Sequence, residues 1–231
     1  MARSCLLVCG IENTGREENG AGYDSPAFSL EGKMFVLPKL PYKYGDLEPF
    51  LSKEQVKAHY KGHHAKYYKN LNAILDGKEV GMTLENFVRG LDKEADDIDL
   101  YHNAAQAWNH DFYWQCLSPR NQGWPREGLY KAIVQNFGTM NDFKYQFTTT
   151  AMKIFGSGWC WLVKDKVGTL LVLPTANADC PSHQEYIPLL TLDLWEHAYY
   201  CDYRWKKIEY IHNFFNHINW RFAEGCYQKV P

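Results

Sequence analysis

The sequence predicts an α+β fold, in which an N-terminal helical hairpin domain precedes a C-terminal α/β domain with a small three-stranded antiparallel sheet. Two observations carry this prediction. Helical patterns come first along the chain, and short apolar runs typical of strands follow only in its second half. The 231 residues include 45% hydrophobic and 23% charged residues, which is typical of a globular protein with a substantial core.

Composition also limits the classes of function. The net charge of −2 excludes a globally basic nucleic-acid-binding protein, and no apolar run approaches the roughly 18 residues of a membrane-spanning helix. We therefore expect neither nucleic acid nor a membrane as a partner. The seven cysteines form no C-x-x-C pair, which favours reduced thiols in an intracellular protein. Aromatic residues make up 16% of the chain, so we expect an interior dense in hydrogen-bonded rings.

Residues 1–33 differ from the rest of the chain. The apolar run at residues 5–9 is too short for a signal peptide, and the acidic residues after it are unusual for a transit peptide. We expect a flexible leader over residues 1–33, for which a targeting role is one option, and a fold that begins near Met34. The leader does not distinguish between cytoplasm, mitochondrion and plastid.

The N-terminal domain is expected to cover residues 34–119. Two prolines predict an extended arm over residues 37–42, because proline lacks an N–H donor. Ser52 and Gln55 have the spacing of a capping box, which predicts a helix start, and Asp76-Gly77 predicts the end of that helix. The predicted helices run from this box to about Leu75, and over residues 84–91 and 100–115.

The C-terminal domain is expected to cover residues 120–231. It follows a loop at 119–125 that is rich in Pro, Gly and Asn. Its helical patterns cover residues 129–137, 140–154 and 210–222. Its strand patterns cover residues 159–163, 168–173 and 188–195.

Three side chains share one face of the first predicted helix. His59, His63 and Tyr67 lie four residues apart, and two imidazoles at this spacing can reach a common metal ion. The alternative is a polar stripe that packs against a partner. His64 lies off this face, and we expect it to be solvated.

The third predicted helix repeats this spacing with Gln106 and His110. Small residues around them allow close packing against another helix. A Gln and a His in so apolar a helix need hydrogen-bond partners, since an unsatisfied buried polar group costs roughly 1–3 kcal/mol. His110 is therefore either a metal ligand or a hydrogen-bonded core histidine.

A third candidate motif follows the last strand pattern. Asp193 and His197 can bind one ion together, and Glu196 is placed to support an imidazole ligand. The alternative is a capped turn with an incidental histidine. Taken together, the three motifs offer three imidazoles and one carboxylate, which suit iron or manganese with one position open for water or substrate. A structural zinc site would more often use thiolates.

The chain resembles the iron/manganese superoxide dismutases over residues 34–231. Four segments carry the resemblance, in the order that the family has them: HYKGHH at 59–64, NAAQAWNHDFYW at 103–114, FGSGWCWL at 155–162 and DLWEHAYYCDY at 193–203. The resemblance implies the fold of the family and its activity, which converts superoxide to dioxygen and hydrogen peroxide by alternation between Fe(III) and Fe(II).

The resemblance also implies roles for individual residues. It implies that His63 is no ligand but lies beside the metal near a subunit interface, and that Tyr67 gates the substrate funnel. Together these two would relay a proton. The implied metal ligands are His59, His110, Asp193 and His197.

Residues around the ligands receive implied roles as well. Glu196 and Tyr200 would reach across the interface of a homodimer, to the partner's His197 and the partner's His63 respectively. Arg204 and neighbouring lysines would attract the superoxide anion. An apolar shell around the metal is implied at Trp108, Trp159 and Trp195.

The choice of metal follows from one glutamine. Iron-type members of the family place it in the third-helix motif, where this chain has Gln106, and manganese-type members place it after the second strand, where this chain has Ala178. The resemblance therefore implies one iron ion per subunit, with manganese as an option.

Departures from the family pattern at Lys61-Gly62 and at residues 205–207 leave the ligands unchanged. The alternative is a non-catalytic metal-binding structural or partner protein with the same fold. A third hypothesis, an iron oxygenase, fits less well, because oxygenases favour two histidines and one carboxylate.

Overall fold

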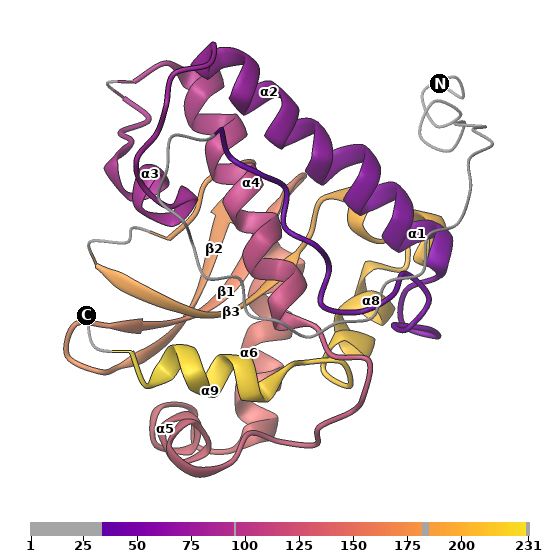
Figure 1. Cartoon of the computed structure of the whole chain (residues 1–231). Coiled ribbons are helices and arrows are strands. Elements are labelled where there is room, and N and C mark those ends of the chain that lie inside the picture. Colours follow the sequence, from indigo (N-terminus) through magenta and orange to yellow (C-terminus); the bar gives the residue numbers. More distant parts are fainter. Residues whose placement is uncertain (1–33, 95, 182–184, 230–231) are drawn as a thin grey trace.

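The computed structural model describes residues 34–94, 96–181 and 185–229, and it confirms the α+β class (Figure 1). The predicted leader lies outside the described residues. Helices fill the first half of the chain, and a three-stranded sheet with further helices fills the second half. In chain order the helices before the sheet are α1 (Lys53–Lys57), η1 (Ala58–His64), α2 (Ala65–Leu75), α3 (Leu84–Gly90), α4 (Ile98–Cys116), α5 (Glu127–Phe137) and α6 (Met140–Lys153).

The first helical rod consists of α1, η1 and α2 and packs against α4. Both predicted ends are confirmed: the Gln55 amide donates to Ser52 Oγ at 3.1 Å, and Asp76 adopts the left-handed conformation with φ 48°. The middle of the rod, η1, is a π-helix, in which each amide bonds the carbonyl five residues back, as Ala65 does to Tyr60. Residues five apart therefore lie above one another in this segment.

This π-helical segment overturns the expectation that His64 is solvated. His64 is fully buried, because the π-helix turns it to the same side as His59, five residues earlier. Its Nδ1 accepts a hydrogen bond from Trp114 Nε1 at 3.2 Å, and its Nε2 lies 3.1 Å from Asp111 Oδ1. The ring is thus held between the rod and α4.

The sheet joins its strands in the order β2-β1-β3, and every pairing is antiparallel. α6 packs against β1 and β2, whereas α4 crosses in front of the sheet and contacts β3 (Figure 1). The central strand brings Trp159 opposite Asp193, which lies at the end of the third strand. The strands are β1 (Gly158–Asp165), β2 (Leu170–Ala176) and β3 (Tyr186–Asp193).

The end of the chain differs from the prediction. The helix predicted over 210–222 is wrong, since a turn separates α8 (Lys207–Phe214) from α9 (Trp220–Tyr227). Asn219 makes the break: its amide donates to the Cys116 carbonyl at 2.8 Å, and its side chain accepts from the first turn of α9. Asparagine side chains compete with helical backbone bonds, which explains the interruption. Two short elements, η2 (Glu196–Ala198) and α7 (Tyr200–Tyr203), were not predicted.

The interior is dense in rings, as the composition predicts. Phe143 and Phe147 from α6 pack against Phe214 and Phe215 at the end of α8. Some of the buried polar atoms in this interior are hydrogen-bonded to one another. Tyr113 and Tyr210 share a hydrogen bond of 3.0 Å, and Trp161 Nε1 donates to Thr175 at 2.9 Å. These bonds satisfy polar groups that would otherwise be buried without a partner.

Candidate metal centre

Four side chains from four separate elements converge in the interior. Their candidate ligand atoms all lie within 4.8 Å of one another. The carboxylate is central, since its Oδ2 lies 3.2 Å from His59 Nε2, 3.6 Å from His110 Nε2 and 3.5 Å from His197 Nε2. The four are His59 from η1, His110 from α4, Asp193 from the end of β3 and His197 from η2.

The four atoms have the character of metal ligands. Each imidazole Nε2 and Asp193 Oδ2 is buried and has no hydrogen-bond partner within the described part of the chain. Burial lowers the pKa of both His59 and His110 well below the ordinary value, with neighbouring imidazoles adding to the effect. These rings are therefore neutral, and their nitrogen lone pairs are available. A cation between them would satisfy four atoms that are otherwise costly to bury.

Local hydrogen bonds orient the ligands. His110 Nδ1 lies 2.7 Å from the Gln106 carbonyl, one helical turn earlier, so the ring donates there and turns Nε2 toward the centre. Asp193 Oδ1 accepts from the Trp195 amide at 2.9 Å, which leaves Oδ2 facing the imidazoles. The chain thus presents one defined atom from each of these two residues.

A hydrogen-bonded chain leads from the sheet across the centre. Trp159 Nε1 donates to Gln106 Oε1 at 3.2 Å, and Gln106 Nε2 donates to Tyr67 OH at 3.3 Å. Burial raises the pKa of Tyr67 to about 12, and Asp193 adds to this rise. The phenol is therefore protonated at neutral pH. The structure brings Gln106 and Tyr67 together beside His110, whose ring lies 5.2 Å from that of Tyr67.

His63 lies beside the cluster but outside it. Its ring stacks on that of His197 with centroids 4.0 Å apart and planes inclined by 15°. Burial lowers the pKa of His63 to about 4, with His197 as the next cause. Its half-buried ring packs against a ligand and is not among the four that converge.

The predicted tryptophan shell is close to the ligands at two of its three positions. Trp159 meets His110 edge-on with centroids 5.0 Å apart, and Trp195 lies 5.4 Å from His197. Trp108 belongs to a second layer, since its ring stacks on Trp161.

The residues of the predicted interface and rim lie at the surface of the single chain. Glu196 and Arg204 are exposed, and Tyr200 is half-buried. Arg204 adopts a positive φ of 55°, which is rare for a residue other than glycine, and its guanidinium donates to the Tyr200 carbonyl at 3.4 Å. None of these three joins the four ligands.

Two aromatic neighbours of the site were missed by sequence reasoning. Trp114 lies 4.7 Å from His59, and Tyr113 lies 5.7 Å from the same ring. A signal was present, because both residues belong to the same motif as His110. Tyr113 and Trp114 follow His110 by three and four residues. Helical spacing alone does not predict that they contact His59, which comes from another helix.

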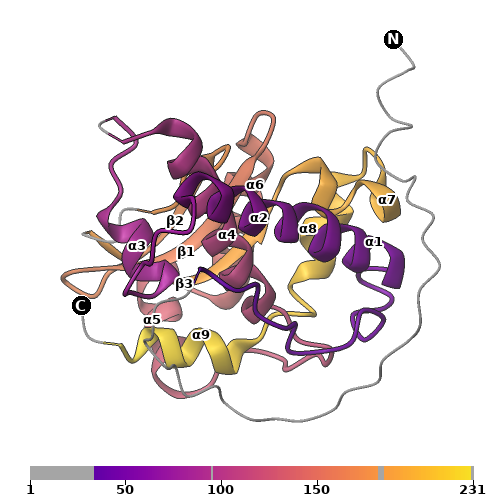
Figure 2. The same cartoon turned by 45° about the horizontal axis from the view of Figure 1, so that its top comes forward.

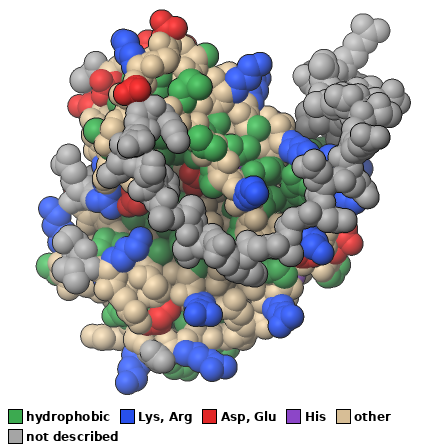
Figure 3. All heavy atoms as spheres, viewed as in Figure 1, with side chains coloured by type: hydrophobic (Ala, Val, Ile, Leu, Met, Phe, Trp, Pro, Cys, Tyr) green, Lys and Arg blue, Asp and Glu red, His purple; other side chains and the backbone are tan. Residues whose placement is uncertain are grey.

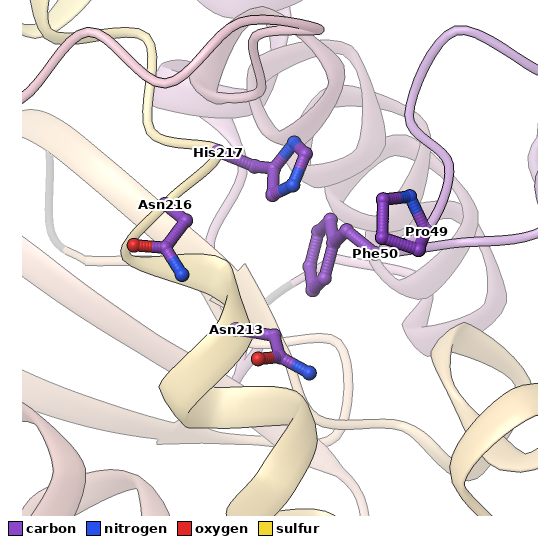
Figure 4. Close-up of a pocket in the computed structure, with 5 residues that line it drawn as sticks. All are labelled: Pro49, Phe50, Asn213, Asn216 and His217. Atoms are coloured by element: carbon purple, nitrogen blue, oxygen red, sulfur yellow. The ribbon is translucent and has the colours of Figure 1, made fainter.

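The structure also contains a pocket of about 200 Å³ (Figure 4). Its Phe50 ring stacks between His217 and Tyr210, at 5.0 Å and 5.5 Å. None of the lining residues belongs to the metal cluster. They are Pro49, Phe50, Asn213, Asn216 and His217.

Among the described residues, no helix is both long and apolar enough to cross a membrane.

The fold and the site together define a class of protein. A helical hairpin supplies two histidines, and an α/β domain supplies an aspartate and a third histidine, to one mononuclear metal centre. Two family models match these parts of the chain. "Iron/manganese superoxide dismutases, alpha-hairpin domain" matches residues 34–118, and "Iron/manganese superoxide dismutases, C-terminal domain" matches residues 125–225. The chain belongs to this family, which confirms the resemblance seen in the sequence.

Individual relatives agree with the family models. A protein named superoxide dismutase (Fe) from Escherichia coli strain K12 is 44% identical over 190 residues, which are 82% of this chain and 96% of the relative. Another of that name, from Legionella pneumophila, is 45% identical over 192 residues, which are 83% of this chain and 97% of the relative. A third, from Salmonella typhimurium, is 45% identical over 190 residues, which are 82% of this chain and 96% of the relative.

Proposed function

We propose that this chain catalyses the disproportionation of superoxide to dioxygen and hydrogen peroxide at one bound iron ion. The observation that carries the proposal is the convergence of four buried, unpartnered ligand atoms at one point. Three neutral imidazoles and one carboxylate leave a net positive charge at a divalent or trivalent ion, which attracts a superoxide anion. No observation favours the non-catalytic alternative. The iron ligands are His59, His110, Asp193 and His197.

Iron is the metal that the relatives are named for. Gln106 supports it, because its side chain lies at the centre in the position implied for iron-type members, while Ala178 stands at the manganese-type position. Manganese accepts the same ligand set and stays an alternative that elemental analysis distinguishes.

Bound iron would supply one-electron redox chemistry, by which one superoxide is oxidised to dioxygen and a second is reduced, with the uptake of two protons, to hydrogen peroxide. The chain supplies the proton path. Tyr67 holds a phenolic proton at neutral pH, and we assign it and His63 to proton delivery. Gln106, held by Trp159, would orient the solvent group at the open coordination position.

Charge at the surface would bring in the substrate. Arg204 is exposed close to Tyr200, and Figure 3 shows Lys and Arg side chains spread over the face of the molecule that it draws. A cationic funnel attracts a small anion, and salt screens this attraction. We expect the rate to fall as ionic strength rises, and a rate independent of salt would contradict steering.

We propose that the active unit is a homodimer formed through Glu196, His197, His63 and Tyr200. In the single chain Glu196 is exposed, and His63 and Tyr200 are half-buried, so all three are available to a second copy. Sedimentation of the wild type and of Glu196→Ala tests this. The wild type should sediment as a dimer, and the variant should shift toward a monomer with lower activity. An intracellular location is also proposed, on the cysteine pattern.

The test of the function measures iron content and superoxide loss in parallel. The wild type should hold about one iron per chain and remove superoxide rapidly. Asp193→Ala should lose both, because it removes the central oxygen ligand. Glu209→Ala, which removes an exposed carboxylate on α8, is the matched control and should keep both. A wild type that binds iron without removing superoxide would overturn the proposal.

A further inference from the structure

The start of α1 does not close its capping box in the usual way. In a capping box the Gln at the third helical position accepts a hydrogen bond from the N-cap amide. Here Ser52 Oγ does accept from the Gln55 amide at 3.1 Å, so half of the box is present. The Ser52 amide instead donates to Asp202 Oδ2 at 2.8 Å, and this carboxylate comes from α7, 150 residues later in the chain.

The Gln55 side chain is thereby free to bind elsewhere. It is fully buried, and both of its polar atoms are used. Its Nε2 donates to the main-chain carbonyl of His197 at 2.6 Å, and its Oε1 accepts from the amide of Cys201 at 3.2 Å. One amide group therefore holds the backbone on both sides of the turn between η2 and α7. Figure 2 shows α7 next to α1, where these bonds form.

The segment held in this way carries a metal ligand. His197 lies in η2, a single turn of 3-10 helix, whose hydrogen bonds are short-range, such as those from Ala198 to Trp195 and from Tyr199 to Glu196. So short a turn has few internal bonds to fix its position. A bond from α1 to the His197 carbonyl supplies a restraint that the turn cannot supply itself.

The same helical rod also carries another ligand. Gln55 precedes His59 by four residues, which is one helical turn, and the rings of His59 and His197 lie 4.8 Å apart. The rod therefore presents one ligand directly and holds the main chain of a second. The two contacts, one to each half of the chain, are therefore only about one turn apart on the rod, at the junction of α1 and η1.

We infer that Gln55 and Asp202 form a clasp that positions His197 for metal binding. Both are positioning residues and not ligands: Gln55 bonds the backbone on both sides of the ligand turn, and Asp202, in α7 just after this turn, bonds the Ser52 amide at the start of α1. The inference rests on the proposed function, because it requires a metal at the four-ligand site. Ligands must be held within roughly 0.5 Å of their working geometry. Mutation of groups that hold the ligands in place commonly lowers metal affinity by about 10–100-fold.

Gln55→Met tests the clasp. Methionine keeps the length of the side chain but makes neither hydrogen bond, so the bonds to the His197 carbonyl and from the Cys201 amide are lost. We expect the variant, loaded with iron, to release the metal to a chelator at least about tenfold faster than the wild type. Its ferric electron paramagnetic resonance spectrum should change in shape, because a displaced imidazole alters the symmetry of the site.

The chain offers a matched control in Asn72. Its side chain makes the same pair of bonds far from the site: Nδ2 donates to the Phe35 carbonyl at 2.8 Å, and Oδ1 accepts from the Phe35 amide at 3.1 Å. Asn72→Leu therefore removes a similar clamp, which anchors the N-terminal arm. It should lower the melting temperature to a similar extent and leave iron release and the spectrum as in the wild type.

Asp202 provides a second pair of variants if Gln55→Met does not fold. Asp202→Ala should also release iron faster than the wild type, by a smaller factor than Gln55→Met. Asp202→Asn should release iron at nearly the wild-type rate, because its side chain keeps an oxygen that accepts from the Ser52 amide. Iron release and spectra that equal the wild type in Gln55→Met, or in Asp202→Ala where only that variant folds, would overturn the clasp. So would an equal change in Asn72→Leu. A wild type that holds no iron would overturn the proposed function instead.

Discussion

The two halves of the metal centre are built differently. His59 and His110 come from the helical hairpin, where each lies inside a long run of helical hydrogen bonds. Asp193 and His197 come from a strand end and a single 3-10 turn, which depend on bonds to other segments. Helices therefore fix two ligands by their own periodicity, whereas the strand end and the turn must be held by their neighbours.

The largest expected effect of a mutation lies on the strand side. Gly158 packs so closely that an added Cβ would lie 2.3 Å from the Thr175 carbonyl oxygen, and its own carbonyl accepts from the Leu194 amide, next to Asp193. Gly158→Ala should lower the free energy of unfolding by about 3 kcal/mol, because the backbone of β2 has to move. Urea unfolding measures this, and a loss under about 1 kcal/mol would contradict the close contact.

Low pH should destabilise the metal-free protein through the two histidines of the helical hairpin. The folded metal-free protein keeps His59 and His110 neutral, since burial lowers the pKa of both, while the unfolded chain protonates them below about pH 6.5. The unfolded state then binds more protons, so stability falls as pH drops below 6.5, by up to about 1.4 kcal/mol per pH unit for each imidazole.

Urea unfolding of the metal-free protein at pH 7.5, 6.5 and 5.5 measures this loss. The variant with both His59→Asn and His110→Asn should show a shallower decline toward acid. An equal slope in the two proteins would assign the acid sensitivity to other groups.

Removal of the metal compares the two halves directly. Hydrogen exchange should rise by roughly tenfold or more in residues 194–203 when iron is extracted, and less in residues 53–75 and 98–116, because the helices keep their own hydrogen bonds. Mass spectrometry of peptides from both forms measures the difference. A uniform rise in all three segments would remove the distinction between the halves.

The smallest expected effect lies on the helical side. A Cβ added at Gly62 meets nothing within 4 Å, and the residue lies inside η1. Gly62→Ala should therefore stabilise the protein by about 0.5–1 kcal/mol, since alanine loses less conformational freedom on folding. Thermal unfolding measures the gain, and a loss of stability would show that η1 needs the freedom of glycine.

The same contrast separates what could and could not be predicted from the sequence. The fold class and most helix and strand positions agree with the structure, and the structure brings the four predicted ligand residues together. Bare helical spacing left His63 as a candidate ligand, and only the resemblance to the family set it aside. Spacing counted in steps of four also misplaced His64, because a π-helix cannot be distinguished from an α-helix by residue type.

Contacts between segments that are distant in the chain could not be predicted from the sequence. The capping box at Ser52 is a local pattern, and its exchange of partners with Asp202 depends on how α7 meets α1. The break at Asn219 similarly depends on the end of α4, whose Cys116 carbonyl accepts from its amide. Local sequence determines which groups need a partner, and only the assembled fold determines which partner they find.

The π-helical segment also limits how the length of this helix can vary. One residue fewer between His59 and Tyr67 would let the rod relax into a regular α-helix, yet it would rotate one of them by about 100° relative to the other. Tyr67, the proposed proton donor, and His59 would then face different directions. Substitutions at the exposed positions of this stretch, Lys61 and Lys66, are therefore tolerated far more readily than insertions or deletions, so homologous genes should conserve the number of codons between His59 and Tyr67 more strictly than the codons at these exposed positions.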